Sequence, residues 1–245
     1  MCCLFLAASS TVAIAQTNVV DLVNPIIGTN GMGHTFPGAC VPFGLVQLSP
    51  DTDTIPHNVD GKYQPRSYEY CAGYQHKDSS IVGFSHTHFS GTGHSDLGDI
   101  LIMPTTGTLK LNPGTATNPD GGYRSRFSHD TEISRPGYYE VMLADYGVKA
   151  QLTTTQRAGI HKYTYPTNSE NQRIILDMIH GIYNYDGKVL WTNIRVENDT
   201  LVTGYRITNG WARTNYTYFA MSFSKPITHY GCEEKAKVNY RGGYA

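Results

Sequence analysis

The residues from 83 to 99 concentrate the side chains of this sequence that can do chemistry. They include three of the ten histidines, His86, His88 and His94, together with two carboxylates and four glycines. Histidine, aspartate, serine and threonine supply hydrogen-bond donors, acceptors and metal ligands, and glycine lets a ligand approach the backbone. Because few large apolar side chains accompany them, this segment buries little by itself. We therefore predict that it binds a ligand.

Three interpretations of the histidines stay open. If residues 86–88 form a strand, two imidazoles point to one face and can complete a divalent metal site, with Zn²⁺ as the default ion. The same side chains equally suit hydrogen bonds to a hydroxyl-rich ligand, and the rings can also be held by backbone carbonyls of their own loop. In the second interpretation the ligand contacts are His86, His88, Ser90, Gly91, His94 and Asp96.

A second glycine-rich segment spans residues 24–44. Its glycine spacing invites comparison with a phosphate-binding loop, but no Lys-Ser/Thr pair follows, and Pro37 prevents the helix that would hold the phosphates. A rigid loop that displays His34, Phe36 and Gly38 to a ligand fits better. The Phe36 ring either stacks on that ligand or anchors the loop in the core.

No residue of the sequence is assigned a catalytic role. Glycoside hydrolysis requires two carboxylic acids that flank the scissile bond, and no pair of carboxylates stands out. Asp51 lies in a Ser-Pro-Asp-Thr run that is typical of a turn. The GxSxG motif of serine hydrolases is absent from the sequence.

Composition excludes several classes of partner. Charged residues make up 16% of the 245 residues and the net charge is −1, so no basic field attracts nucleic acid. No apolar stretch reaches the roughly 20 residues of a membrane span. The 18 tyrosines, 25 glycines and 12 prolines are typical of strands joined by tight turns.

The first residues resemble an export signal. An apolar run over residues 2–8 leads to Ala13-Ile14-Ala15, the small-residue pattern of a secretory cleavage site. We predict a signal peptide over residues 1–15 and a mature chain over 16–245, in the periplasm, on the cell surface or outside a bacterium. Cys40, Cys71 and Cys232 then remain, an odd number with no zinc-ribbon spacing.

The rest of the sequence predicts an all-β fold, a large antiparallel β-sandwich with long Gly- and His-rich loops in the first third. Alternation of apolar and polar residues, with turn residues every 8–12 positions, is typical of such folds. Strands are expected at 45–48, 81–84, 138–143, 148–153, 161–165, 173–178, 201–207 and 216–223.

Several motifs resemble the N-terminal domain of glycoside hydrolase family 92, the calcium-dependent exo-α-mannosidases. The matching stretches are VNPIIGT at 23–29, TFPGA at 35–39, PFGLVQLSPD at 42–51, GFSHTHFSGTG at 83–93, RPGYY at 135–139 and TQRAG at 155–159. The resemblance extends from about residue 21 to the C-terminus.

The resemblance implies a β-sandwich that packs on a C-terminal (α/α)6 catalytic domain and lends loops to a shared site. That domain is missing from this sequence and would carry the acid and base of an inverting reaction on terminal α-mannosidic bonds of mannose-rich glycans. It would also supply most ligands of a Ca²⁺ ion. Because calcium prefers oxygen ligands, histidine contact with sugar or loop becomes the preferred role. We expect this chain alone to be inactive.

Two further hypotheses belong to other classes. One is a free-standing carbohydrate-binding module, and the other is a complete enzyme with a histidine-ligated metal.

Overall fold

The computed structural model describes residues 18–91, 94, 96–182 and 185–233. The signal peptide expected at residues 1–15 lies outside this described part. Within it, the helical segments are short 3₁₀ turns, η1 (Val19–Leu22), η2 (Pro65–Tyr70), η3 (Pro119–Gly121) and η4 (His129–Thr131). Strands make up the remaining regular structure, so the predicted all-β class is confirmed.

A four-stranded antiparallel sheet forms one layer of the sandwich. Its strands run in the order β12-β11-β10-β9, with bounds β9 (Ile133–Arg135), β10 (Tyr138–Leu143), β11 (Val148–Thr154) and β12 (Gly159–Thr164). Buried and partly exposed residues alternate along β10 and β11. This alternation is the period-2 pattern of a sheet that covers a core with one face.

A five-stranded sheet forms the central layer. Its order is β1-β2-β6-β7-β13, with bounds β1 (Ala39–Cys40), β2 (Gln47–Asp51), β6 (Gly83–Ser85), β7 (Leu101–Thr105) and β13 (Arg173–Asp177). Every residue of β6 and β7 is buried, so both faces of this part of the sheet are covered.

The hydrophobic core lies between these two sheets. Phe84, Leu101 and Met103 of the central sheet face Tyr139 and Val148 of the four-stranded sheet. Each of these five side chains is at most 1% exposed. Burial of such side chains stabilises the fold by about 1.5–3 kcal/mol each.

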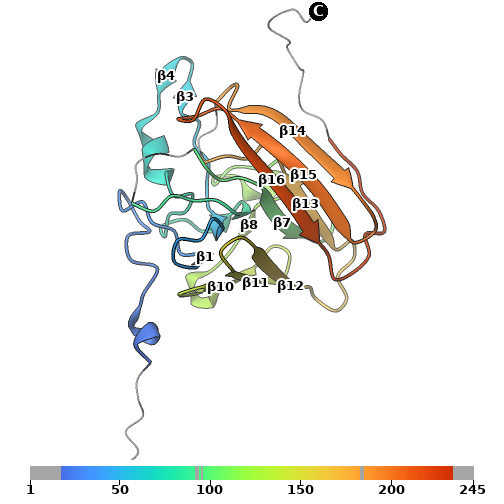
Figure 1. Ribbon diagram of the computed structural model, residues 1–245. Coiled ribbons are helices and arrows are strands. Elements are labelled where there is room, and N and C mark those ends of the chain that lie inside the picture. Colours follow the sequence, from blue (N-terminus) through green and yellow to red (C-terminus); the bar gives the residue numbers. More distant parts are fainter. Residues whose placement is uncertain (1–17, 92–93, 95, 183–184, 234–245) are drawn as a thin grey trace, which may run out of the picture.

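A third layer is a three-stranded antiparallel sheet in the order β14-β15-β16, formed by β14 (Val189–Val196), β15 (Leu201–Thr208) and β16 (Asn215–Ser222). Figure 1 shows this orange sheet on the side of β7 and β13 that faces away from β10–β12. Two small ladders complete the fold, β3 (Asn58–Val59) with β4 (Lys62–Tyr63), and β5 (Ser80–Ile81) with β8 (Ser125–Arg126). No described helix is long and apolar enough to cross a membrane.

The structure corrects three local expectations. Strand β6 ends at Ser85, so residues 86–88 are not a strand and two rings do not share a face by alternation. Asp51 is the last residue of β2 and not part of a turn. Strand β14 was not predicted, because its residues alternate poorly in polarity and none of them is buried.

Gly38, expected to contact a ligand, is packed against the backbone of β2. A Cβ atom at this position would lie 2.2 Å from the carbonyl oxygen of Leu48 and 2.3 Å from the Cα of Ser49. The close approach of β1 to β2 therefore requires glycine here.

The substitution Gly38→Ala should lower the free energy of unfolding by about 2–3 kcal/mol, because overpacking against backbone atoms forces the strands apart. Urea unfolding followed by circular dichroism measures the effect. Gly231→Ala is the matched control, since a Cβ there meets nothing within 4 Å. Equal stability of the two variants would contradict this packing argument.

Candidate functional site

The carboxylate of Asp51 is the centre of the polar structure beneath the glycine-rich loops. Its Oδ1 lies 2.8 Å from Nε2 of His88, and its Oδ2 lies 2.7 Å from Nε2 of His180. Asp51 is fully buried. Its carboxylate fits only because residue 73 is glycine, since a Cβ there would lie 2.0 Å from Oδ1.

His88 uses both ring nitrogens inside the protein. Its Nδ1 donates to the carbonyl oxygen of Gln47 at 2.7 Å, and Nε2 faces Asp51. A carbonyl and a carboxylate both accept, so the ring that satisfies them donates twice and carries a positive charge. Burial raises the pKa of Asp51, but the charge of His88 and the hydrogen bonds from both histidines more than reverse this, so that pKa lies well below its usual range.

A second ion pair continues this network toward the three-stranded sheet. The carbonyl oxygen of His180 accepts from Nη1 of Arg206, a side chain of β15 with no exposed area. The Nε of Arg206 lies 3.2 Å from Oδ1 of Asp99, and Oδ2 of Asp99 accepts from the Thr87 hydroxyl at 2.9 Å. These contacts fix the loop between β6 and β7 to β15.

Lys188 is buried near the same arginine. Both its Nζ and Nη2 of Arg206 would lie 3.2 Å from a Cβ added at Gly181. Burial and the neighbouring Arg206 charge lower the pKa of Lys188 to about 7.

His86 belongs to a separate chain of neutral groups. Its Nδ1 donates to the carbonyl oxygen of Ile100 at 2.7 Å, which leaves Nε2 as an acceptor, 3.0 Å from Nε2 of His161. Nδ1 of His161 in turn lies 2.7 Å from the Tyr163 hydroxyl, which donates to it. Burial lowers the pKa of His86 to about 4 and that of His161 well below its usual value.

The two glycine-rich loops meet at the surface above this network. The amide of Gly91 donates to the carbonyl oxygen of His34 at 2.6 Å. The His34 ring packs edge-on against Tyr68 at 4.7 Å between ring centroids, and its Nε2 is buried without a hydrogen-bond partner in the described structure. The Phe36 ring lies 5.2 Å from that of His88, so it anchors its loop.

His94 and Asp96 form a second group with Trp211, which follows β15. The rings of His94 and Trp211 stack at 4.5 Å between centroids, and the Trp211 amide donates to Oδ2 of Asp96 at 2.6 Å. Asp96 also lines a hollow of about 180 Å³, together with Phe89, Leu97, Thr208, Gly210, Ala212 and Asn215. This hollow is smaller than the roughly 300–1,000 Å³ of a complete ligand pocket.

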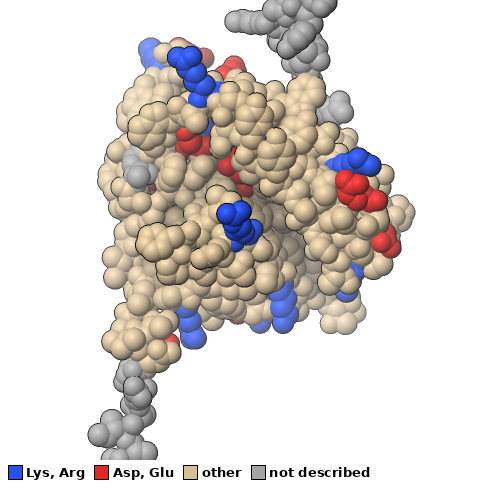
Figure 2. Space-filling view, in the orientation of Figure 1, with Lys and Arg blue, Asp and Glu red and all other residues tan. Residues whose placement is uncertain are grey.

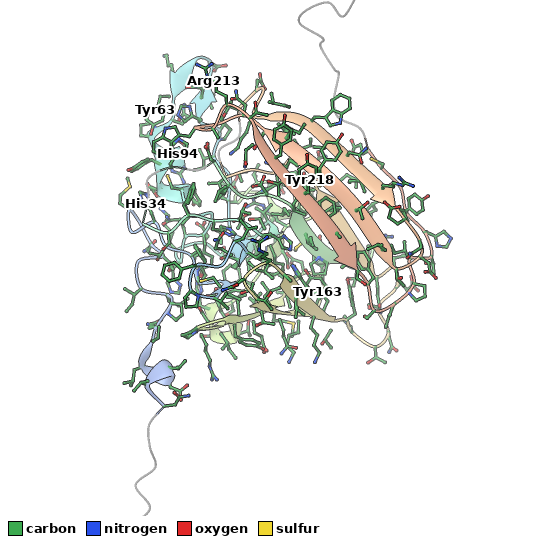
Figure 3. The ribbon with its side chains drawn as sticks, in the orientation of Figure 1. His34, Tyr63, His94, Tyr163, Arg213 and Tyr218 are labelled. Carbon is green, nitrogen blue, oxygen red and sulfur yellow. The ribbon has the colours of Figure 1, made fainter. Side chains whose placement is uncertain are left out.

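The exposed part of these loops offers aromatic and hydrogen-bonding groups to a ligand. His34 and His94 lie on the same side of the molecule (Figure 3). Asp96 is the one carboxylate among the described residues that line the hollow. Figure 2 shows a face that is mostly uncharged, with isolated basic and acidic groups. Hydrolysis by paired acids needs a second carboxylate from elsewhere.

Comparison with known proteins identifies the family. Residues 22–243 match the glycosyl hydrolase family 92 N-terminal domain. The chain belongs to glycosyl hydrolase family 92. It spans only the N-terminal part of the family's enzymes.

Two solved family 92 structures resemble the fold. The α-mannosidase BT3965 from Bacteroides thetaiotaomicron, in complex with mannoimidazole, is 45% identical with a TM-score of 0.77, over 86% of this chain and 26% of that chain. The family 92 glycosyl hydrolase ccman5 is 25% identical with a TM-score of 0.63, over 83% of this chain and 26% of that chain.

A curated relative is described as an uncharacterized secreted glycosidase of Arthroderma benhamiae. It is 29% identical over 170 residues, which is 66% of this chain and 19% of the relative. This chain thus spans about a quarter or less of the length of the relatives it matches.

The structure places the sequence-predicted site residues in two groups. His34, Ser90, Gly91, His94 and Asp96 lie on or just below the loop surface, whereas Phe36, Gly38, His86 and His88 have partners inside the protein. The segment therefore does not bring its three histidines to a common metal site. Contact of any of these residues with a sugar stays a prediction.

Sequence reasoning missed Asp51, His180 and Arg206. The first two come together across 129 positions of sequence. The sequence did offer one indication of Asp51, because this residue ends the motif PFGLVQLSPD that carries the family resemblance.

Replacement Asp51→Asn should destabilise the chain by about 3–5 kcal/mol, because it removes the buried anion that compensates the charge of His88 and accepts a hydrogen bond from His180. Chemical unfolding at neutral pH measures this loss. The matched control is Asp186→Asn, a side chain exposed in a turn. A loss below 1 kcal/mol would show that Asp51 is not the centre of the network.

Stability should fall as the pH falls from about 6.5 to about 4. The unfolded chain binds protons on His86 and His161 in this range, whereas the folded chain keeps both rings neutral, and His86 alone contributes about 3 kcal/mol. Urea midpoints at several pH values test this. His86→Gln should flatten the slope, and His229→Gln, with an exposed ring, should not. The same dependence of stability on pH in the parent protein and both variants would contradict this prediction.

Proposed function

We propose that this chain is the sugar-facing N-terminal domain of an exported α-mannosidase that hydrolyses terminal α-mannosidic bonds in mannose-rich glycans. The match to the family 92 N-terminal domain carries the proposal, together with 45% identity to a solved α-mannosidase described with bound mannoimidazole. Export is supported by the secreted glycosidase of Arthroderma benhamiae.

In this proposal the loops supply one wall of a shared site. His34, Ser90, Gly91, His94 and Asp96 face the sugar at the non-reducing end. His94 stacked on Trp211 gives a flat aromatic surface, and rings of this kind pack well on the apolar faces of sugars. The buried Nε2 of His34 has no hydrogen-bond partner among the described residues, so a ligand hydroxyl can satisfy it.

Exposed apolar residues in the first glycine-rich loop are evidence for a second domain that covers it. Ile27, Met32, Phe43 and Leu45 are exposed by 61–105%, within 19 residues that also include His34 and Phe36. Large exposed apolar side chains close in sequence to candidate binding residues favour an interaction surface in this part of the chain. We propose that the family's C-terminal (α/α)6 domain covers them and completes the pocket.

The acid and base of an inverting reaction belong to that second domain in this proposal. A Ca²⁺ ion, if bound, supplies a hard cation that grips sugar hydroxyls. The described loops fit such an ion poorly, because Ca²⁺ takes 6–8 oxygen ligands and Asp96, the carboxylate at the hollow, already accepts from the Trp211 amide. Its ligands therefore come mainly from outside this chain.

A chimera tests the proposal. This chain replaces the equivalent quarter of the 45% identical α-mannosidase, and hydrolysis of α-mannobiose is measured. The chimera should be active and the chain alone inactive, and Asp96→Asn in the chimera should lower kcat/KM by about 10- to 100-fold, since misplacement of substrate carries a penalty of this size. Asp199→Asn, in a distant exposed turn, is the control.

The outcomes separate the hypotheses. Turnover of mannoside by the purified chain alone would overturn the shared-site proposal. Tight mannobiose binding by the chain alone, without turnover by the chimera, would favour a free-standing carbohydrate-binding module.

A further inference from the structure

A second cluster of histidines lies apart from the candidate sugar-binding residues. It consists of His76 in the connection between η2 and β5, His129 in η4, and Glu132, which caps η4 before β9. One ligand atom from each residue lies within 4.8 Å of the other two. We call these three residues the His76 cluster.

The carboxylate of Glu132 is held firmly in this cluster. Its side chain is 3% exposed, and the Tyr74 hydroxyl lies 2.9 Å from both of its oxygens. The Tyr139 hydroxyl donates to Oε1 at 2.6 Å. Such surrounding donors orient a carboxylate as they orient metal ligands.

The two imidazoles lie face to face beside this carboxylate. Their ring centroids are 4.0 Å apart with the planes tilted by 36°. Nδ1 of His129 lies 2.6 Å from Oε2 of Glu132, and the ring packs edge-on against Phe127 at 5.0 Å. The His129 side chain is 36% exposed, so an ion has a path from solvent.

We propose that His76, His129 and Glu132 bind a divalent transition-metal ion of the zinc class, with solvent completing the coordination. Two imidazoles and one carboxylate are a borderline set that Zn²⁺ accepts at about 2.0–2.2 Å per bond. Ligand atoms of a tetrahedral site with these bonds are roughly 3.4 Å apart. Small side-chain rotations bring the three ligand atoms to these distances. The ion then replaces the proton that His129 and Glu132 share in the metal-free protein.

The ion joins segments that are distant in sequence. The His76 amide donates to the carbonyl oxygen of Thr29 at 2.8 Å, in the loop that continues to His34. Glu132 leads into β9 at the edge of the four-stranded sheet. The bound metal therefore stabilises the connection between this sheet and the first glycine-rich loop. This role is independent of the proposed mannosidase activity.

The test uses the full chain without an affinity tag, freed of metal by a chelator and dialysis. Calorimetric titration with ZnCl₂ should give one equivalent with a micromolar or lower Kd, and the melting temperature should rise with zinc. His76→Asn and His129→Asn should each weaken binding at least 100-fold. His229→Asn, an exposed histidine outside the cluster, should bind as the parent protein does.

Other results would overturn the assignment. These are no binding at millimolar zinc, equal binding by the parent and the two cluster variants, or a rise in melting temperature with Ca²⁺ in place of Zn²⁺. Circular dichroism of the metal-free variants establishes that each is folded. Because each cluster histidine is changed separately, one folded variant is sufficient for the comparison.

Discussion

The buried carboxylate of Asp51 holds the central layer of this protein to the segments around it. A lone ionised carboxylate in such a place is strongly unfavourable, and here it is compensated by a hydrogen bond from each of two histidines. One histidine follows β6 and the other follows β13. The single side chain at the end of β2 thus joins three parts of the chain that are distant in sequence.

The buried network around Asp51 fixes the position of the two glycine-rich loops. His88 faces Asp51 with one nitrogen and the Gln47 carbonyl with the other, so the residues after it begin from a fixed point. Gly91 then bonds to His34, which joins the second loop to the first. A rigid base beneath irregular loops is what a binding site on a β scaffold requires. This base also explains why some of the predicted site residues lie inside the protein and others lie at the loop surface.

Local patterns allowed much of the fold to be predicted. Strand β10 was expected at its observed bounds, and β11 to within one residue, because one face of each is buried and alternation is strong. Strands β15 and β16 were also expected to within one residue, but β14 was not, since it exposes residues on both faces. Pairing with β15 holds β14 in place without the buried face that sequence reasoning depends on.

The site itself was only partly predictable for a related reason. The segment around His88 was found because its composition is unusual, but its partners were not, since His180 and Arg206 lie in unremarkable sequence. The Ser-Pro-Asp-Thr run has the composition of a turn, yet its aspartate ends a strand. Local sequence carries the types of polar groups, whereas long-range topology decides which of them are buried together.

The chain formed by Tyr163, His161 and His86 has one direction, because it ends on a backbone carbonyl that can only accept. Each ring is thereby committed to a single tautomer. Replacement of any one member by an apolar residue leaves a neighbouring donor or acceptor without its hydrogen-bond partner. In homologous proteins these three positions should accordingly vary as a set, and a lineage that fills one with a hydrocarbon side chain should do so at the others too.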